Sequence, residues 1–211
     1  MKISVCLFGL LILGYVCFAD VFDSPLNTES EAEFKALTER TSRNNVTKGD
    51  FTQIKSISSL NRQIRSFGTF VISNSDGMVW NTQKPFPSAM VLTDKAVTQI
   101  SASGKKTVVA ESGNSAFTQF STVLSAVFNG DHDILVKNFH VYFVQKDQVW
   151  FVGLVPKDSS LRAFVTKIEM EGQDSIKKVL LQEATGDSVC YEFSNVMFAQ
   201  ELTSDELAYF R

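Results

Sequence analysis

The stretch from Phe51 to Ser101 limits the possible folds most, because short runs of alternating apolar and polar residues follow one another there, separated by turn-forming residues. A period of two is typical of a β-strand that buries one face. Asp76-Gly77 lies between two of these runs, and this pair favours a two-residue hairpin turn. The pattern therefore predicts that Phe67–Asn74 and Met78–Thr82 form an antiparallel hairpin.

The same alternation predicts further strands on both sides of this hairpin. We expect them at Asp50–Ile57, Ser88–Thr93, Ala96–Ser101, Lys105–Ala110, Phe139–Val144, Val149–Val155, Phe164–Glu171, Ile176–Leu181 and Ser188–Phe193. Leu60–Ser66 fits either a strand or a turn of helix. Roughly ten antiparallel strands are enough for a sheet to curl strongly or close. We therefore expect an α+β fold, mainly antiparallel β, with residues 20–211 in a single domain.

Glu29–Arg40 has the signals of a short amphipathic helix. Thr28 or Ser30 suits the N-cap position, and acidic residues in the first turn suit the helix dipole. Phe34 and Leu37 lie on one side of this helix. We expect that side to rest against the sheet.

Ser115–Phe128 changes to a helical period. Its apolar residues at spacings of three and four are Phe117, Phe120, Leu124 and Phe128. Such a helix either packs into the core or lies over the mouth of a cavity, and the spacing alone fits both. Ser204–Phe210 is expected to form a final short helical turn.

Met1–Ala19 is predicted to be a signal peptide. Lys2 supplies the positive start, an apolar run follows, and Cys17-Phe18-Ala19 forms a small-x-small site, so we expect export and cleavage before Asp20. A lipid anchor at Cys17 and a retained membrane anchor are the alternatives.

The net charge argues against one class of binding partner, and the cysteine content argues against stabilisation by a disulfide. The formal net charge is −3 at pH 7, and removal of Lys2 with the leader makes it more negative by one. Nucleic acid, which requires a basic face, is therefore not an expected partner. Cys6 and Cys17 leave with the leader, and Cys190, alone in a predicted strand, is expected to be an inert buried thiol without a disulfide.

The residues carry no motif for catalysis, a metal or a cofactor. Asp131-His132-Asp133 is the densest titratable cluster, but neighbours in one turn rarely converge on a metal, and we expect a solvated loop there. No nucleophile elbow, phosphate loop or paired-cysteine motif is present. We therefore expect neither an enzyme nor a metal or cofactor site.

Apolar residues are abundant, and Phe alone occurs 18 times in 211 residues. Alternation places Phe70 with Ile72, Met78 with Trp80, and Met90 with Leu92 on common strand faces. The residues that we single out as candidate walls of an apolar cavity are Phe70, Ile72, Met78, Trp80, Met90, Leu92, Phe143 and Trp150. The same side chains could instead fill one another in a solid core.

A family resemblance favours the cavity. The matching segments are Phe51-Thr52-Gln53, Gly68-Thr69-Phe70, Met78-Val79-Trp80, Lys84-Pro85, Met90–Thr93, Trp150–Pro156, Ile168-Glu169-Met170, Gly186-Asp187 and Tyr191-Glu192-Phe193. In their order and spacing the sequence resembles the LolA-like outer-membrane lipoprotein carrier family, over roughly residues 30–195.

The resemblance implies an unclosed antiparallel β-barrel of about ten to eleven strands, whose helices cover a hydrophobic cavity. It also implies a monomeric, non-enzymatic periplasmic carrier and chaperone. Such a carrier takes lipid-modified protein or other acylated cargo from an inner-membrane exporter to an outer-membrane acceptor. On this interpretation the candidate wall residues bind acyl chains, and Phe117, Phe120 and Leu124 belong to a lid.

One departure from the family pattern keeps other functions open. Carriers of that family have an arginine on the second barrel strand that holds the lid closed, whereas the corresponding Ile72-Ser73-Asn74-Ser75 has none. Another lipid or a polyene-type acyl product would then fit as cargo equally well. A sensor or scaffold with the same barrel is a second hypothesis, and a lipid hydrolase that uses His132 or His140 is a third.

Overall fold

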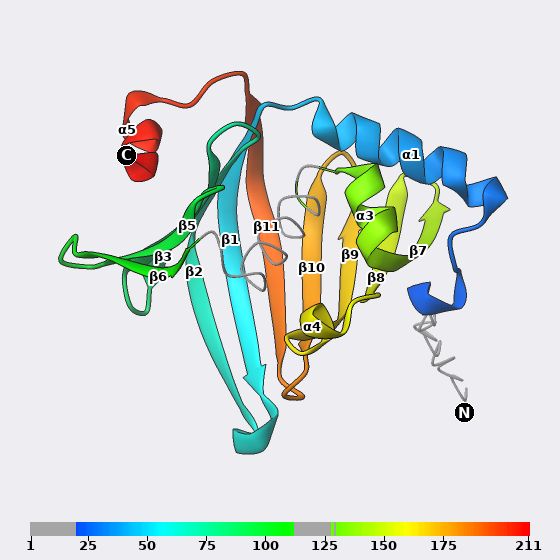
Figure 1. Ribbon diagram of the computed structural model, residues 1–211, viewed down its shortest axis with the longest axis horizontal. Coiled ribbons are helices and arrows are strands. Elements are labelled where there is room, and N and C mark those ends of the chain that lie inside the picture. The colour runs from blue at the N-terminus through cyan, green and yellow to red at the C-terminus, as the bar shows by residue number, and fades with distance from the viewer. Residues whose placement is uncertain (1–19, 112–127, 129) are drawn as a thin grey trace, which may run out of the picture.

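The computed structural model describes residues 20–111, 128 and 130–211. One antiparallel sheet of eleven strands dominates it, in the order β6-β5-β4-β3-β2-β1-β11-β10-β9-β8-β7. Its two edge strands, β6 and β7, do not pair with each other in this part of the chain, so the sheet curls without closing (Figure 1). The expected α+β, mainly antiparallel, unclosed barrel is confirmed.

All the predicted strands are present, and most extend beyond their predicted ends. Their bounds are β1 Val46–Ile57, β2 Arg62–Ser73, β3 Gly77–Lys84, β4 Ser88–Leu92, β5 Ala96–Ser101, β6 Lys106–Glu111, β7 Phe139–Lys146, β8 Val149–Pro156, β9 Val165–Gly172, β10 Ile176–Glu183 and β11 Ser188–Ala199. The undecided Leu60–Ser66 is mostly strand, because β2 pairs with β1 along its whole length.

The turn between β2 and β3 differs from the prediction. Ser73 pairs with Gly77, so three residues connect the strands, and the expected two-residue Asp76-Gly77 turn is wrong. The Asp76 carboxylate accepts hydrogen bonds from the hydroxyls of Ser73 (2.8 Å) and Ser75 (2.6 Å), which holds the turn together. Gly77 has φ +118°, and a Cβ there would collide with the carbonyl oxygen of Leu92. Close approach of β3 to β4 therefore requires glycine at this position.

Helix α1 spans Thr28–Ser42 and begins at neither expected cap. Its N-cap is Asn27, whose side-chain oxygen accepts hydrogen bonds from the backbone N–H groups of Glu29 (2.9 Å) and Ser30 (3.0 Å). Ser30 Oγ in turn accepts the backbone N–H of Asn27 at 3.1 Å, which completes a capping box. Serine acts here as the third helical residue of the box, so the helix starts earlier than predicted.

The other described helices are short. They are α3 His132–Asn138, α4 Ser159–Arg162 and α5 Ser204–Leu207, with 3₁₀ turns η1 Val21–Asp23, η2 Ser58–Leu60 and η3 Ala208–Phe210. The predicted final helical turn is thus confirmed. Within the described ranges, no helix combines the length and the apolar character that crossing a membrane requires.

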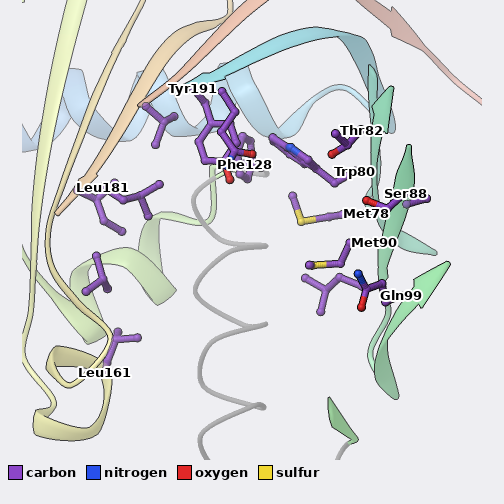
Figure 2. A pocket seen from close by; sticks show the side chains of 16 residues that line it. Met78, Trp80, Thr82, Ser88, Met90, Gln99, Phe128, Leu161, Leu181 and Tyr191 are labelled. Atoms are coloured by element: carbon purple, nitrogen blue, oxygen red, sulfur yellow. The ribbon is translucent and has the colours of Figure 1, made fainter. Parts of the chain in front are cut away.

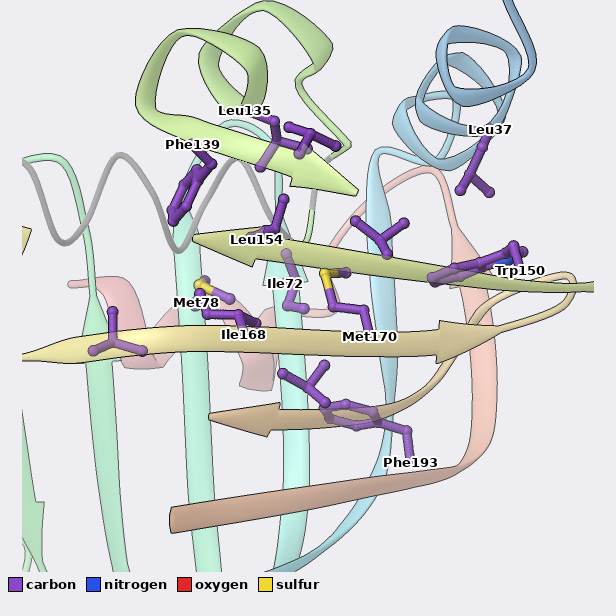
Figure 3. Close-up of a cluster of buried hydrophobic side chains, with 14 of the residues drawn as sticks. Leu37, Ile72, Met78, Leu135, Phe139, Trp150, Leu154, Ile168, Met170 and Phe193 are labelled. Atoms are coloured by element: carbon purple, nitrogen blue, oxygen red, sulfur yellow. The ribbon is translucent and has the colours of Figure 1, made fainter. Parts of the chain in front are cut away.

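Helices α1 and α3 cover only the end of the concave face that is formed by the last strands (Figure 1). Phe34 and Leu37 of α1 and Leu135 of α3 are buried in one apolar cluster with Phe143 and Leu154. Figure 3 shows Leu37, Leu135 and Leu154 of this cluster. The rings of Phe34 and Phe143 lie 5.6 Å apart. This end of the concave face is therefore a filled core.

The N-terminal segment protects the edge strand β7. Leu26 N donates to Val141 O and Phe143 N donates to Ser24 O, both at 2.9 Å. Pro25 and Tyr142 form a β-bridge between these two contacts. Hydrogen-bonding groups on an open sheet edge invite pairing with other chains, and this segment covers some of them.

The close approach at Gly77 predicts unequal effects of two glycine substitutions. Gly104 also has a positive φ (+81°) but has no atom near its Cβ position. Gly104→Ala should therefore lower the free energy of unfolding by only about 1–2 kcal/mol, the backbone strain alone. Gly77→Ala adds the collision with Leu92 and should cost more than about 3 kcal/mol. Urea unfolding of both variants measures this, and equal costs would contradict the close approach.

Candidate functional site

Part of the concave face beyond the filled core is hollow. A cavity of about 360 Å³ lies there, within the roughly 300–1,000 Å³ typical of ligand pockets (Figure 2). Its lining residues are Gln53, Met78, Trp80, Thr82, Ser88, Ala89, Met90, Leu92, Gln99, Phe128, Leu161, Val165, Ile168, Val179, Leu181 and Tyr191. They come from both sides of the curled sheet, so the curvature itself creates the cavity.

The first wall is built by strands β3, β4 and β5. Cross-strand pairs on their concave face are Met78 with Leu92, Trp80 with Met90, and Thr82 with Ser88. Gln99 of β5 pairs with Met90 and extends this wall. Methionine side chains can adopt several shapes against a ligand, so this wall is deformable.

The second wall lies opposite the first. Its described residues include no methionine, and its side chains are therefore less flexible than those of the first wall. Ile168 of β9 pairs with Leu181 of β10, and Val179 of β10 pairs with Tyr191 of β11. Leu161 of α4 closes the lower end of this wall in Figure 2. The second wall therefore presents mainly aliphatic side chains to the methionines and Trp80 of the first wall.

Trp80 lies at the junction of the first wall and the middle of the sheet. The centroids of five aromatic rings lie 5.0–6.0 Å from its ring: Phe51, Phe70, Phe128, Tyr191 and Phe193. Ring contacts at this spacing contribute beyond their buried area. This aromatic cluster fixes Trp80 between the cavity and the strands β1, β2 and β11.

No charged side chain lines the cavity among the described residues, and all its polar members are neutral. Burial raises the pKa of the Tyr191 phenol to about 12, and the nearby Glu183 carboxylate adds to this shift. Tyr191 therefore stays protonated at neutral pH. Such a site is suited to hydrocarbon, because each buried methylene contributes about 0.8 kcal/mol.

The structure brings four of the eight candidate wall residues to this cavity: Met78, Trp80, Met90 and Leu92. Phe70 and Ile72 instead line a small neighbouring crevice of about 30 Å³. Phe143 and Trp150 lie in the filled core, where both side chains are buried. Trp150 Nε1 donates a hydrogen bond to Gln173 O at 2.7 Å. These two residues lie apart from the cavity because α1 and α3 already occupy that end of the concave face.

The candidate lid residues Phe117, Phe120 and Leu124 lie outside the described residues. Phe128, from the end of the same predicted helix, is described and lines the cavity. Its ring lies 5.8 Å from Trp80 and 5.9 Å from Phe193. One residue of the predicted apolar stripe thus reaches the aromatic cluster.

Sequence reasoning missed the second wall. Ile168 and Leu181 both stood in predicted strands, but their place opposite Met78 and Met90 depends on the curvature of the whole sheet. The pairing register of β10 and β11 would have indicated this wall, because it places Val179 and Tyr191 side by side on the same face of the sheet. Gln53 could have been found in the same way, as the β1 partner of Tyr191.

The titratable clusters lie elsewhere and serve structural roles. Asp131-His132-Asp133 is not the expected solvated loop, because Asp131 caps α3 and His132 Nε2 lies 2.8 Å from Glu31 Oε1 of α1. His140 is exposed on β7, and neither histidine lines the cavity. In the described ranges no three His, Cys, Asp or Glu side chains converge as metal ligands.

The predicted burial of Cys190 is only partly correct. The side chain is partly accessible rather than buried. Its partial burial still raises the pKa of the thiol, which opposes formation of a reactive thiolate.

Comparison with known proteins gives one family match and several distant structural likenesses. The family model described as outer membrane lipoprotein carrier protein LolA matches residues 42–209. Among curated protein sequences, none matches the chain.

The similar solved structures include three bacterial proteins. A LolA superfamily protein from Nitrosomonas europaea is 10% identical, with 85% of this chain and 96% of that chain covered and a TM-score of 0.46. A chain of the Pseudomonas aeruginosa MucA/MucB complex is 13% identical, with coverages of 85% and 60% and a TM-score of 0.48. LprF from Mycobacterium bovis is 11% identical, with coverages of 85% and 97% and a TM-score of 0.41.

The raised pKa of Tyr191 predicts a loss of stability in alkali. An unfolded tyrosine ionises near pH 10, whereas the folded Tyr191 ionises near pH 12, so its contribution is present below pH 10 and is lost between these values. At pH 11 the loss should be about 1 kcal/mol. Urea unfolding at pH 8 and pH 11 should show a smaller fall for Tyr191→Phe than for the unmodified protein. An identical fall would contradict the burial of this phenol.

Proposed function

The chain belongs to the outer membrane lipoprotein carrier protein LolA family, and on this basis we propose that it is a carrier of acyl chains. It binds the acyl chains of lipoproteins, or of a related lipid, in the cavity between the two walls. It releases them again without chemical change, and thereby moves them from the inner to the outer membrane.

The observation that carries this proposal is the uncharged cavity on the concave face. Eleven of its sixteen described lining residues are apolar and the other five are neutral. Hydrocarbon is therefore the ligand that gains most by entering it.

Reversible burial explains how such a carrier would work. A few methylenes, at about 0.8 kcal/mol each, already give usable affinity. Transfer to an acceptor then needs only a modest difference in binding free energy between two conformations or two partners. No bond is made or broken, which agrees with a cavity lining that offers no acid, base or activated nucleophile among the described residues.

The proposed compartment is the periplasm. The leader Met1–Ala19 would direct export, and cleavage after Ala19 would release a protein that begins with Asp20. Its proposed partners are an inner-membrane exporter that supplies the acylated cargo and an outer-membrane acceptor that receives it.

The matched residues Met90 and Met197 provide the test. Met90 lines the cavity and is 51% exposed, whereas Met197 of β11 is 56% exposed and does not line it. Because both side chains are half exposed, aspartate at either position should leave the fold intact. Met90→Asp should reduce co-purifying lipid at least tenfold, since it places a charge in the hydrocarbon site. Met197→Asp should retain the lipid.

Native mass spectrometry of the exported protein, with lipid extraction, measures the occupancy of each variant. Circular dichroism establishes that both variants are folded. A folded Met90→Asp protein with unchanged lipid occupancy would count against the carrier proposal. So would an unmodified protein that never carries lipid when it is purified from membrane-containing cells.

A further inference from the structure

The cavity contains neutral polar groups that its apolar role does not require. Five of its lining residues are polar: Gln53, Thr82, Ser88, Gln99 and Tyr191. Within the part of the chain that the structure describes, their side chains make no hydrogen bonds. Four of the five are half-buried and Gln99 is exposed, so these groups are accessible to a bound ligand.

The most constrained of the unpartnered groups is the indole N–H of Trp80. Its Nε1 atom is buried and is the one buried side-chain nitrogen or oxygen in the described residues that has no hydrogen-bond partner. The second tryptophan behaves differently, since Trp150 Nε1 donates to Gln173 O at 2.7 Å. A buried N–H without an acceptor is unfavourable, and an acceptor supplied by the ligand would remove that cost.

Three polar groups meet at one end of the cavity. Gln53 of β1 and Tyr191 of β11 are direct register partners. The rings of Trp80 and Tyr191 lie 5.2 Å apart at an angle of 79°. In Figure 2 the Trp80 ring extends from β3 towards the side of the cavity where Tyr191 lies. Gln53 and the Trp80 ring thus both neighbour Tyr191, and all three residues line the cavity.

The chemistry of this end selects a class of ligand group. The indole N–H only donates, while the phenol and the amide can donate to a carbonyl oxygen. Because no cationic side chain lines the cavity in the described ranges, a free carboxylate or phosphate there would be buried without a counter-charge. A neutral carbonyl, such as that of an ester or an amide, meets no such penalty.

We propose that Gln53, Trp80 and Tyr191 form a polar subsite that binds the carbonyl of an ester- or amide-linked acyl chain, with the Trp80 N–H as a donor. The subsite selects acyl esters and amides over free fatty acids and over alkyl ethers. This inference rests on the proposed carrier function and specifies which acylated molecules the cavity accepts.

A contact within the protein is the competing explanation. An N–H that points at the face of the Tyr191 ring makes a weak N–H···π interaction and needs no ligand. In that case the ligand would be recognised by its hydrocarbon alone. Lipids that differ only at the carbonyl separate the two explanations.

The experiment compares a diacylglycerol with the dialkyl glycerol ether of the same chain length, each titrated into the delipidated mature protein. The unmodified protein should bind the ester about tenfold more tightly than the ether, a difference of about 1.4 kcal/mol. Trp80→Phe keeps an aromatic ring but removes the N–H, so the ratio of ester affinity to ether affinity should fall from about ten to about one. Trp150→Phe, the matched control, should keep the preference. The corresponding free fatty acid should bind more weakly than the ester.

Indole N–H resonances of the ¹⁵N-labelled unmodified protein give a measurement that does not depend on any variant folding. The chain has two tryptophans, so two such resonances exist. The Trp80 proton should shift downfield with the ester and not with the ether, while that of Trp150 stays in place.

Three results would overturn the subsite: equal binding of ester and ether by the unmodified protein, a preference that survives in Trp80→Phe, or a Trp80 resonance that does not distinguish the lipids. The first of these leaves the carrier proposal intact. Failure of both lipids to bind would remove the carrier proposal together with the subsite.

Discussion

The structure depends on the burial of one face of a single sheet. Alternation along the strands sends apolar side chains to the concave face, and the eleven strands carry more of them than the described helices cover. Helices α1 and α3 fill the end above β7–β9, with Phe34 and Leu135 as their anchors. The part of the concave face that these helices do not cover contains a cavity, and the lining of this cavity favours hydrocarbon over water. The core and the cavity are continuous, since Met78, Leu92 and Ile168 belong to the buried cluster and also line the cavity.

The aromatic cluster around Trp80 lies where core and cavity meet. Trp80 touches rings from β1, β2 and β11, so the first wall is tied to the middle of the sheet. Close packing of this kind resists the collapse of one wall onto the other. The deformable part of the cavity is then the methionine side of the first wall, at Met78 and Met90. A rigid end and an adaptable side suit a ligand with a fixed linkage and a flexible chain.

Local patterns predicted the strands and their antiparallel order, because alternation and turn residues are read within a few positions. These patterns did not predict the features that depend on contacts between residues far apart in the sequence. The turn after Ser73 has three residues, and Gly77 serves in the close approach to Leu92 of the next strand rather than as the second residue of the turn. Phe143 and Trp150 show the correct alternation for a wall, but which part of the concave face α1 and α3 cover is set by tertiary packing. The second wall was missed for the same reason, since Leu181 faces Met90 only after the sheet has curled.

Photochemical labelling tests the hydrocarbon cavity most directly. A lipid with a photoreactive group at the end of its acyl chain is bound to the mature protein and irradiated, and the labelled peptides are identified by mass spectrometry. Adducts are expected on both walls, in β3–β4 and in β9–β10, which face the same cavity. Adducts confined to exposed residues outside the cavity, such as Val108 or Met197, would contradict an acyl-chain site between the walls.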